Sequence, residues 1–122
     1  MIDAIRAICQ QLIGPAQTPD ALLSSMDTRL WEAVRVDPAP GTPDEAAQVR
    51  LTLPDAATLT LGDLSAAFGD YRTPPRIKPE SPQQVAFSYE AKSVAGCTIF
   101  ARVDPSAEIT ATTEVQSLFL RR

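Results

Sequence analysis

The sequence predicts an α+β fold in which residues 1–122 form a single α+β domain. Two segments before residue 30 carry apolar side chains at helical spacing, and a short capped helix is indicated again after residue 60. Segments on either side of that helix alternate apolar and polar side chains, as half-buried strands do. We therefore expect two N-terminal helices, a β-hairpin, a short central helix and three antiparallel strands, forming one five-stranded sheet with helices on one face.

The N-terminal helices are indicated by their apolar faces and by their end signals. The first opens near Asp3 and is stopped by Gly14-Pro15. The second opens at Thr18, a capping hydroxyl, followed by proline at the first helical position, where a missing N–H costs nothing. The apolar faces are Ile2, Ile5, Ile8, Cys9, Leu12 and Ile13 in the first helix, and Leu22, Leu23 and Met26 in the second.

The segment at 28–37 allows two interpretations. Its apolar residues suit a continuation of the second helix, and they equally suit a strand entered after Asp27-Thr28. We predict a helix to about Arg29 and a strand over 31–37, because alternation over 49–53 supplies a matching strand. The residues between them, 37–47, hold three prolines and a glycine and predict a long exposed hairpin loop.

The central helix and the three strands after it are the best-defined part of the sequence. Thr60 is the expected N-cap, Asp63 lies where a carboxylate favours the helix start, and Gly69 is expected to end the helix in a left-handed conformation. Prolines exclude a helix or a central strand over 71–84. Alternation then predicts strands over 85–89, 97–103 and 109–120, and a change of phase in the last one indicates a bulge near Ser117 or burial of both faces.

The residue inventory excludes most catalytic chemistry. There is no histidine, hence no Ser-His or Cys-His pair, and the glycines match no phosphate-binding loop. Two cysteines are too few for a structural zinc site. We interpret Cys9 and Cys97 as small buried apolar side chains rather than a disulfide, given an expected reducing compartment. We expect no enzymatic activity, no metal and no cofactor.

Charge and hydropathy limit the partners and the location. The chain has 15 acidic and 11 basic residues, a net charge of −4, without the concentrated positive footprint that nucleic acid requires. No apolar run is long enough to span a membrane and no leader is evident. We therefore expect no nucleic-acid partner, no membrane association and a cytoplasmic location.

One stretch resembles a known fold. Thr60, Asp63, Leu64, Phe68 and Gly69, followed by a proline-containing loop and three meandering strands, resemble the helix-plus-three-strand unit of the β-lactamase-inhibitor-like fold, shared with small outer-membrane-assembly lipoproteins. The resemblance covers residues 59–120 and departs from those families at 70–73, where they usually place a proline. It implies a non-catalytic, partner-binding protein and assigns no functional residue.

These observations predict a small protein-binding module, with inhibitor or immunity proteins of bacterial type as one such class and a basic protein among the partners considered. The alternative is a small-molecule-binding or weakly catalytic domain with a pocket between sheet and helices. Loops on a rigid scaffold and large aromatic or arginine side chains are the usual carriers of binding. The predicted partner-binding residues are Tyr71, Arg72, Arg76 and Lys78 in the proline-rich loop, Trp31, and the acidic pair Asp44 and Glu45.

Overall fold

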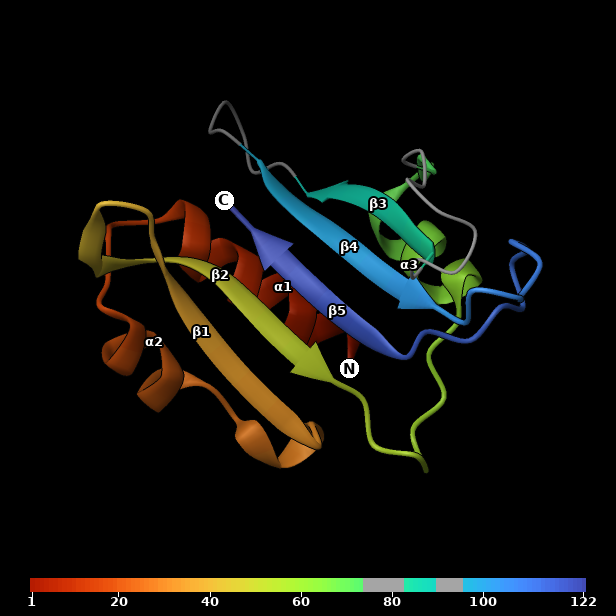
Figure 1. Cartoon of the computed structure of the whole chain (residues 1–122), viewed down its shortest axis with the longest axis horizontal. Coiled ribbons are helices and arrows are strands. Elements are labelled where there is room, and N and C mark those ends of the chain that lie inside the picture. The colour runs from red at the N-terminus through yellow and green to blue at the C-terminus, as the bar shows by residue number, and fades with distance from the viewer. Residues whose placement is uncertain (74–82, 90–95) are drawn as a thin grey trace.

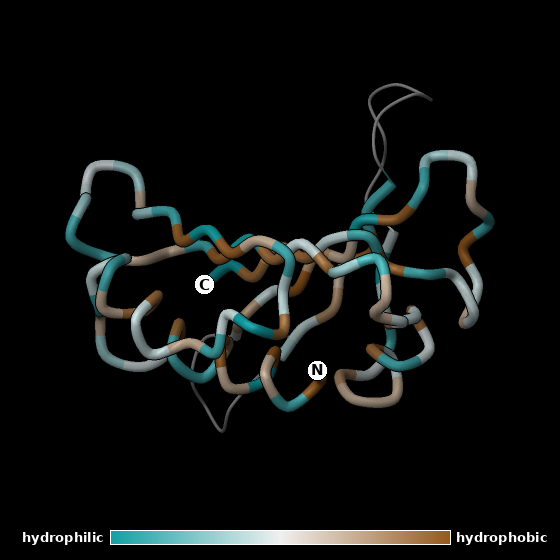
Figure 2. Tube along the Cα trace, turned by 90° about the horizontal axis from the view of Figure 1, so that it is seen from below, coloured by the Kyte–Doolittle hydropathy of each residue, from teal (hydrophilic) through white to brown (hydrophobic). Residues whose placement is uncertain are grey.

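A five-stranded antiparallel sheet forms the body of the molecule in the computed structural model, which describes residues 1–73, 83–89 and 96–122 (Figure 1). The strand order is β1-β2-β5-β4-β3. Seen along the sheet, the described helices lie on one of its sides (Figure 2). The predicted α+β class is confirmed. The elements are α1 (Ile2–Ile13), α2 (Pro19–Ser25), a 3₁₀ turn η1 (Thr28–Leu30), β1 (Ala33–Ala39), β2 (Thr42–Thr52), α3 (Leu61–Phe68), β3 (Gln83–Tyr89), β4 (Cys97–Val103) and β5 (Ser117–Arg121).

The first two helices lie where predicted, but the second is shorter. In α2 the Thr18 hydroxyl accepts a hydrogen bond from the Ala21 N–H, and Met26 leaves the helix in an extended conformation. The predicted end near Arg29 is wrong because the Asp27 carboxylate accepts from the Arg29 N–H and starts the separate turn η1. A capping residue inside an apolar pattern ends one helix and begins another turn.

The hairpin of β1 and β2 replaces the long loop predicted over 37–47. The two strands pair antiparallel, with Val36 opposite Val49, and only Pro40-Gly41 separates them. Register shifts at Asp37/Pro38 and Pro38/Ala39 accommodate the extra residues of β2. Proline is tolerated there because β1 is an edge strand, where a missing N–H need not remove a ladder hydrogen bond.

The start of α3 is a complete capping box. The Thr60 hydroxyl accepts from the Asp63 N–H at 3.2 Å, and the Asp63 carboxylate accepts from the Thr60 N–H at 3.0 Å. The helix ends at Gly69, as predicted, with φ 88° and ψ −163°. This conformation differs from the expected left-handed helical one and belongs to a region that essentially only glycine occupies.

Gly69→Val is therefore expected to lower the free energy of unfolding by about 1 to 2 kcal/mol. A Cβ at Gly69 would meet no atom within 4 Å, so the loss comes from backbone conformation and not from a clash. Urea denaturation of parent and variant measures it. Ala66→Val, at an exposed position inside α3, is the control and should cost about 0.5 kcal/mol. An unchanged midpoint for Gly69→Val would contradict the assignment.

The last predicted strand, 109–120, is mostly irregular, and β5 covers only its end. The change of phase comes neither from a bulge at Ser117 nor from burial of both faces. Val115 lies before the strand, where its N–H donates to the Leu59 carbonyl, and it is buried outside the alternation of β5. Of the proline-rich segment, 74–82 lies outside the described residues.

The core lies between the sheet and the helices. Inward side chains of the four strands β2 to β5 meet α1, the Leu22 side of α2 and α3. Phe87 and Ile99 are both fully buried and lie opposite each other in β3 and β4. The fully buried strand residues include Val49, Leu51, Val85, Phe87, Cys97, Ile99, Ala101, Leu118 and Leu120.

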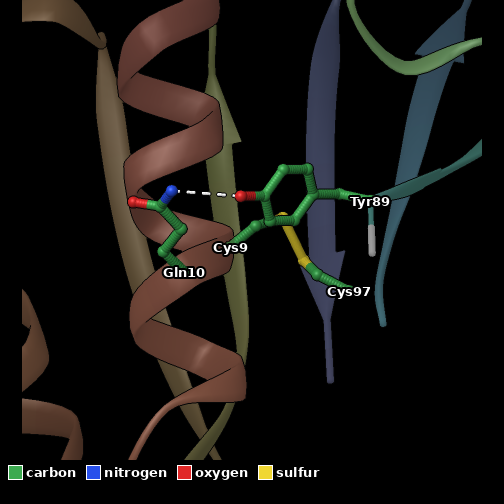
Figure 3. The surroundings of a disulfide bond; sticks show 4 residues. All are labelled: Cys9, Gln10, Tyr89 and Cys97. Carbon is green, nitrogen blue, oxygen red and sulfur yellow. Dashed lines mark hydrogen bonds between the residues drawn. A yellow bond between two sulfur atoms is a disulfide. The ribbon is translucent and has the colours of Figure 1, made fainter. Parts of the chain in front are cut away.

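A disulfide between Cys9 and Cys97 joins α1 to β4 across this core (Figure 3). The prediction of two separate buried thiols is wrong. The Cα atoms are 5.5 Å apart, a spacing typical of disulfides. Beside it, the Gln10 amide donates to the Tyr89 hydroxyl at 3.0 Å, a second link between α1 and the sheet (Figure 3). The docking of a helix on a sheet, which no local pattern specifies, brings the two cysteines together.

Candidate binding surface

The predicted aromatic anchors are not free. Trp31 is buried with 6% of its surface exposed, so its prediction as an exposed anchor is wrong; after η1 it turns into the core while Leu30 stays exposed. Tyr71 is half-buried, with its ring 5.7 Å from that of Phe87.

The basic residues of the predicted loop are described only in part. Arg72 is exposed, and its backbone pairs with Ala86 through two hydrogen bonds of 2.9 and 2.7 Å, which extends the outer edge of β3. Arg76 and Lys78 lie outside the described residues.

The predicted acidic residues lie in β2 and not in a loop. Asp44 is exposed, and the Glu45 carboxylate forms an ion pair with the Arg122 guanidinium. Strand order places β2 and the segment beside β3 on opposite sides of β5 and β4. The structure therefore does not bring Asp44 and Glu45 together with Tyr71 and Arg72.

The face of the sheet opposite the helices carries the outward side chains of the strands, most of which are polar. Because strand side chains alternate, the neighbours of the core residues point to this other side. The described helices lie on the other side of the sheet (Figure 2). We call this surface the open sheet face; its principal side chains are Arg35, Asp37, Gln48, Arg50, Gln84, Thr98, Phe100, Arg102, Phe119 and Arg121.

Four arginines and one aspartate stand on this face among the described residues, in a chain whose net charge is −4. On the β1–β2 half the charges are balanced by hydrogen bonding. The Asp37 carboxylate accepts hydrogen bonds from Arg35 Nε at 2.8 Å and from the Gln48 amide at 3.5 Å, and it forms an ion pair with Arg50 Nε at 3.0 Å. Asp37 is therefore the centre of a local cluster.

The β5–β4 half holds arginines without such a partner. The Arg102 guanidinium lies 4.4 Å and that of Arg50 5.4 Å from the centre of the Phe119 ring. Arg102 Nε is buried and has no hydrogen-bond acceptor, and within the described part of the chain neither Arg102 nor Arg121 has an ion pair. A shallow depression of about 280 Å³ lies here, lined by Gln48, Arg50, Gln84, Phe100, Arg102, Phe119 and Arg121.

The groups with clearly shifted pKa values lie away from this face. The Arg29 guanidinium lowers the pKa of Asp27, and the Ser106 hydroxyl and N–H lower the pKa of Asp104. Both carboxylates are exposed, so these are surface hydrogen bonds and not a tuned acid-base pair. Over residues 1–73, 83–89 and 96–122, no three His, Cys, Asp or Glu side chains group as a metal site would require.

A second depression, of about 620 Å³, lies beyond the end of β2 and beside the 104–116 segment. Its lining includes the carboxylates of Glu32, Asp55, Asp104 and Glu114. It does not lie between the sheet and the helices, where buried apolar side chains pack.

No protein family, curated protein or solved structure matches this chain. The resemblance of residues 59–120 to the β-lactamase-inhibitor-like unit therefore stays a prediction. Within the described residues, no helix is both long enough and apolar enough to cross a membrane.

The arginines of the open sheet face were missed because they are far apart in the sequence. Arg50, Arg102 and Arg121 read as scattered surface charges. A signal was nevertheless available: each occupies an outward position of an alternating strand, between residues such as Val49 and Leu51 that point inward. Only strand order and register bring them onto neighbouring strands.

Proposed function

We propose that this chain is a non-catalytic protein-binding module and that the open sheet face is its binding surface. The observation that carries the proposal is the combination of Phe100, Phe119 and four arginines on a sheet face with no described helix over it. Aromatic and arginine side chains are enriched at protein interfaces and among their energetically dominant residues. An inhibitor or immunity protein is one class that fits such a module.

The charge of the open sheet face indicates the charge of the partner that it favours. The acidic net charge made a basic protein one option, whereas the arginines of the open sheet face favour a partner with acidic groups there. The proline-rich loop stays a predicted second contact, with Tyr71 and Arg72 at its described end.

The location is a separate part of the proposal. The sequence predicts a cytoplasmic location from the lack of an apolar span and a leader, and that location implies reduced thiols. The Cys9–Cys97 disulfide instead favours an oxidising compartment, since disulfides are rare where glutathione and thioredoxin keep thiols reduced.

Small-molecule binding is the less supported alternative. It requires a cavity between sheet and helices, and the described part of that interface is packed with apolar side chains. The depression of about 620 Å³ lies elsewhere and is lined by several carboxylates.

Site-specific photo-crosslinking in the organism of origin tests the protein-binding proposal. A photoreactive phenylalanine analogue at Phe100, which is half-exposed on the open sheet face, is expected to form a discrete adduct with another protein. The matched control places the same analogue at Ala7, an exposed residue of α1 on the helical side. Equal labelling from both positions, or adducts from Ala7 alone, would contradict the assignment of the surface.

A further inference from the structure

We propose that the segment bound by the open sheet face is an acidic polypeptide segment whose carboxylates pair with Arg102 and Arg121. This inference rests on the proposed function and specifies the chemistry of the partner.

The chain itself shows how this face holds a carboxylate. Asp37 accepts hydrogen bonds from Arg35 and Gln48 and forms an ion pair with Arg50, and only 19% of its side chain is exposed. Charge-assisted hydrogen bonds of this kind are stronger than neutral ones. The β5–β4 half has the same donor types, Arg102, Arg121 and Gln84, but the described residues supply no carboxylate to it.

Among these donors, Arg102 has its guanidinium held in place by a ring contact. Its guanidinium stacks on Phe119 at 4.4 Å, which holds the planar fork in one orientation. Its Nε is buried without an acceptor, so the donors that the guanidinium offers to an incoming carboxylate are its terminal nitrogens. Arg121, the residue opposite Gln48 on one side and Thr98 on the other, is exposed and adds a second positive charge on the adjoining strand.

A protein partner is favoured over nucleic acid by two features. The Phe119 ring is already contacted by the guanidinium groups of Arg50 and Arg102, which leaves Phe100 as the one free aromatic ring on the described part of this face, whereas single strands stack successive bases on several rings. The net charge of −4 also repels a polyanion such as nucleic acid. The few carboxylates of an acidic segment can be neutralised by the arginines of this face alone.

The test is a titration of the isotope-labelled full chain with a short synthetic peptide rich in glutamate and aspartate, followed by NMR. We expect the Nε–H signals of Arg102 and Arg121 and the amides of β4 and β5 to shift. Arg102→Gln combined with Arg121→Gln should weaken binding by about tenfold, since each substitution removes charge-assisted hydrogen bonds. Raising the salt concentration should weaken binding of the parent chain in the same direction.

Two controls isolate charge at this site. The matched peptide with glutamine and asparagine should bind detectably more weakly, and Arg29→Gln, in η1 and already paired with Asp27, should leave affinity unchanged. Amide spectra establish that each variant is folded. The inference is overturned if the acidic peptide shifts neither arginine, if both peptides bind equally, if Arg29→Gln weakens binding as much as the double variant, or if an oligouridylate binds more tightly than the peptide.

The peptide titration and the photo-crosslinking experiment can fail independently, so failure of this inference can be distinguished from failure of the proposed function. A protein adduct at position 100 without acidic-peptide binding would retain the module and reject the acidic partner. Peptide binding at Arg102 and Arg121 without any adduct would support the chemistry of the site and reject a protein partner in the cell.

Discussion

Replacing Cys9 and Cys97 together with alanine is expected to lower the free energy of unfolding by about 2 to 5 kcal/mol. The bond joins residues separated by 88 positions, so it restricts a long loop in the unfolded chain. It also holds α1, which packs on β2, β4 and β5, against the sheet. Urea denaturation of the parent chain and the double variant measures the loss.

Reduction provides the control for this prediction. A reductant should shift the urea midpoint of the parent toward that of the double variant and leave the variant unchanged. Mass spectrometry under non-reducing conditions should find no free thiol. Two alkylatable thiols in the purified native chain, or a parent midpoint insensitive to reductant, would contradict the role assigned to the disulfide.

Phe87→Ala is the second substitution with a large expected effect, a loss of about 3 to 5 kcal/mol in unfolding free energy. Phe87 is fully buried in β3, opposite Ile99 and in edge contact with Tyr71, so truncation leaves a cavity that a sheet on a packed core cannot close completely. Ile99→Ala should cost about 2 to 5 kcal/mol for the same reason. Thermal and urea unfolding give both values.

The next residue in the strand is the matched control. Ser88 points to the open sheet face and is exposed, so Ser88→Ala is expected to cost less than about 0.5 kcal/mol. Thr98 lies opposite Ser88 in β4, and we expect Thr98→Ala to cause a similarly small loss of unfolding free energy. Similar losses at positions 87 and 88 would mean that the register of β3 is wrong.

The local elements were predictable because their signals are local. Sequence alternation defined β3 and β4, and helical spacing defined α1; burial alternates strictly in β4, whereas Val85, Ala86 and Phe87 are all buried in β3. The capping pair Thr60 and Asp63 fixed the start of α3, since both partners lie within one turn of the chain. The fold class follows from the order of these elements.

Competing local signals explain the boundaries that were missed. Apolar spacing predicts that α2 continues past Met26. In the structure the Asp27 carboxylate instead accepts a hydrogen bond from the Arg29 N–H, and a separate turn begins there. Prolines and a glycine suggested a long loop after Asp37, yet an edge strand with bulges tolerates Pro38.

By itself, the sequence determined the positions of α1, α3, β3 and β4, the α+β class and which side chains of β3 and β4 face the core, because these depend on periodicity and capping within a few residues. The tertiary structure alone decided which distant residues meet. Docking of α1 on the sheet placed Cys9 against Cys97, and strand order gathered Arg50, Arg102 and Arg121 around Phe119. Burial of Trp31 was likewise decided there, since exposure depends on what packs above a side chain and not on its neighbours in sequence.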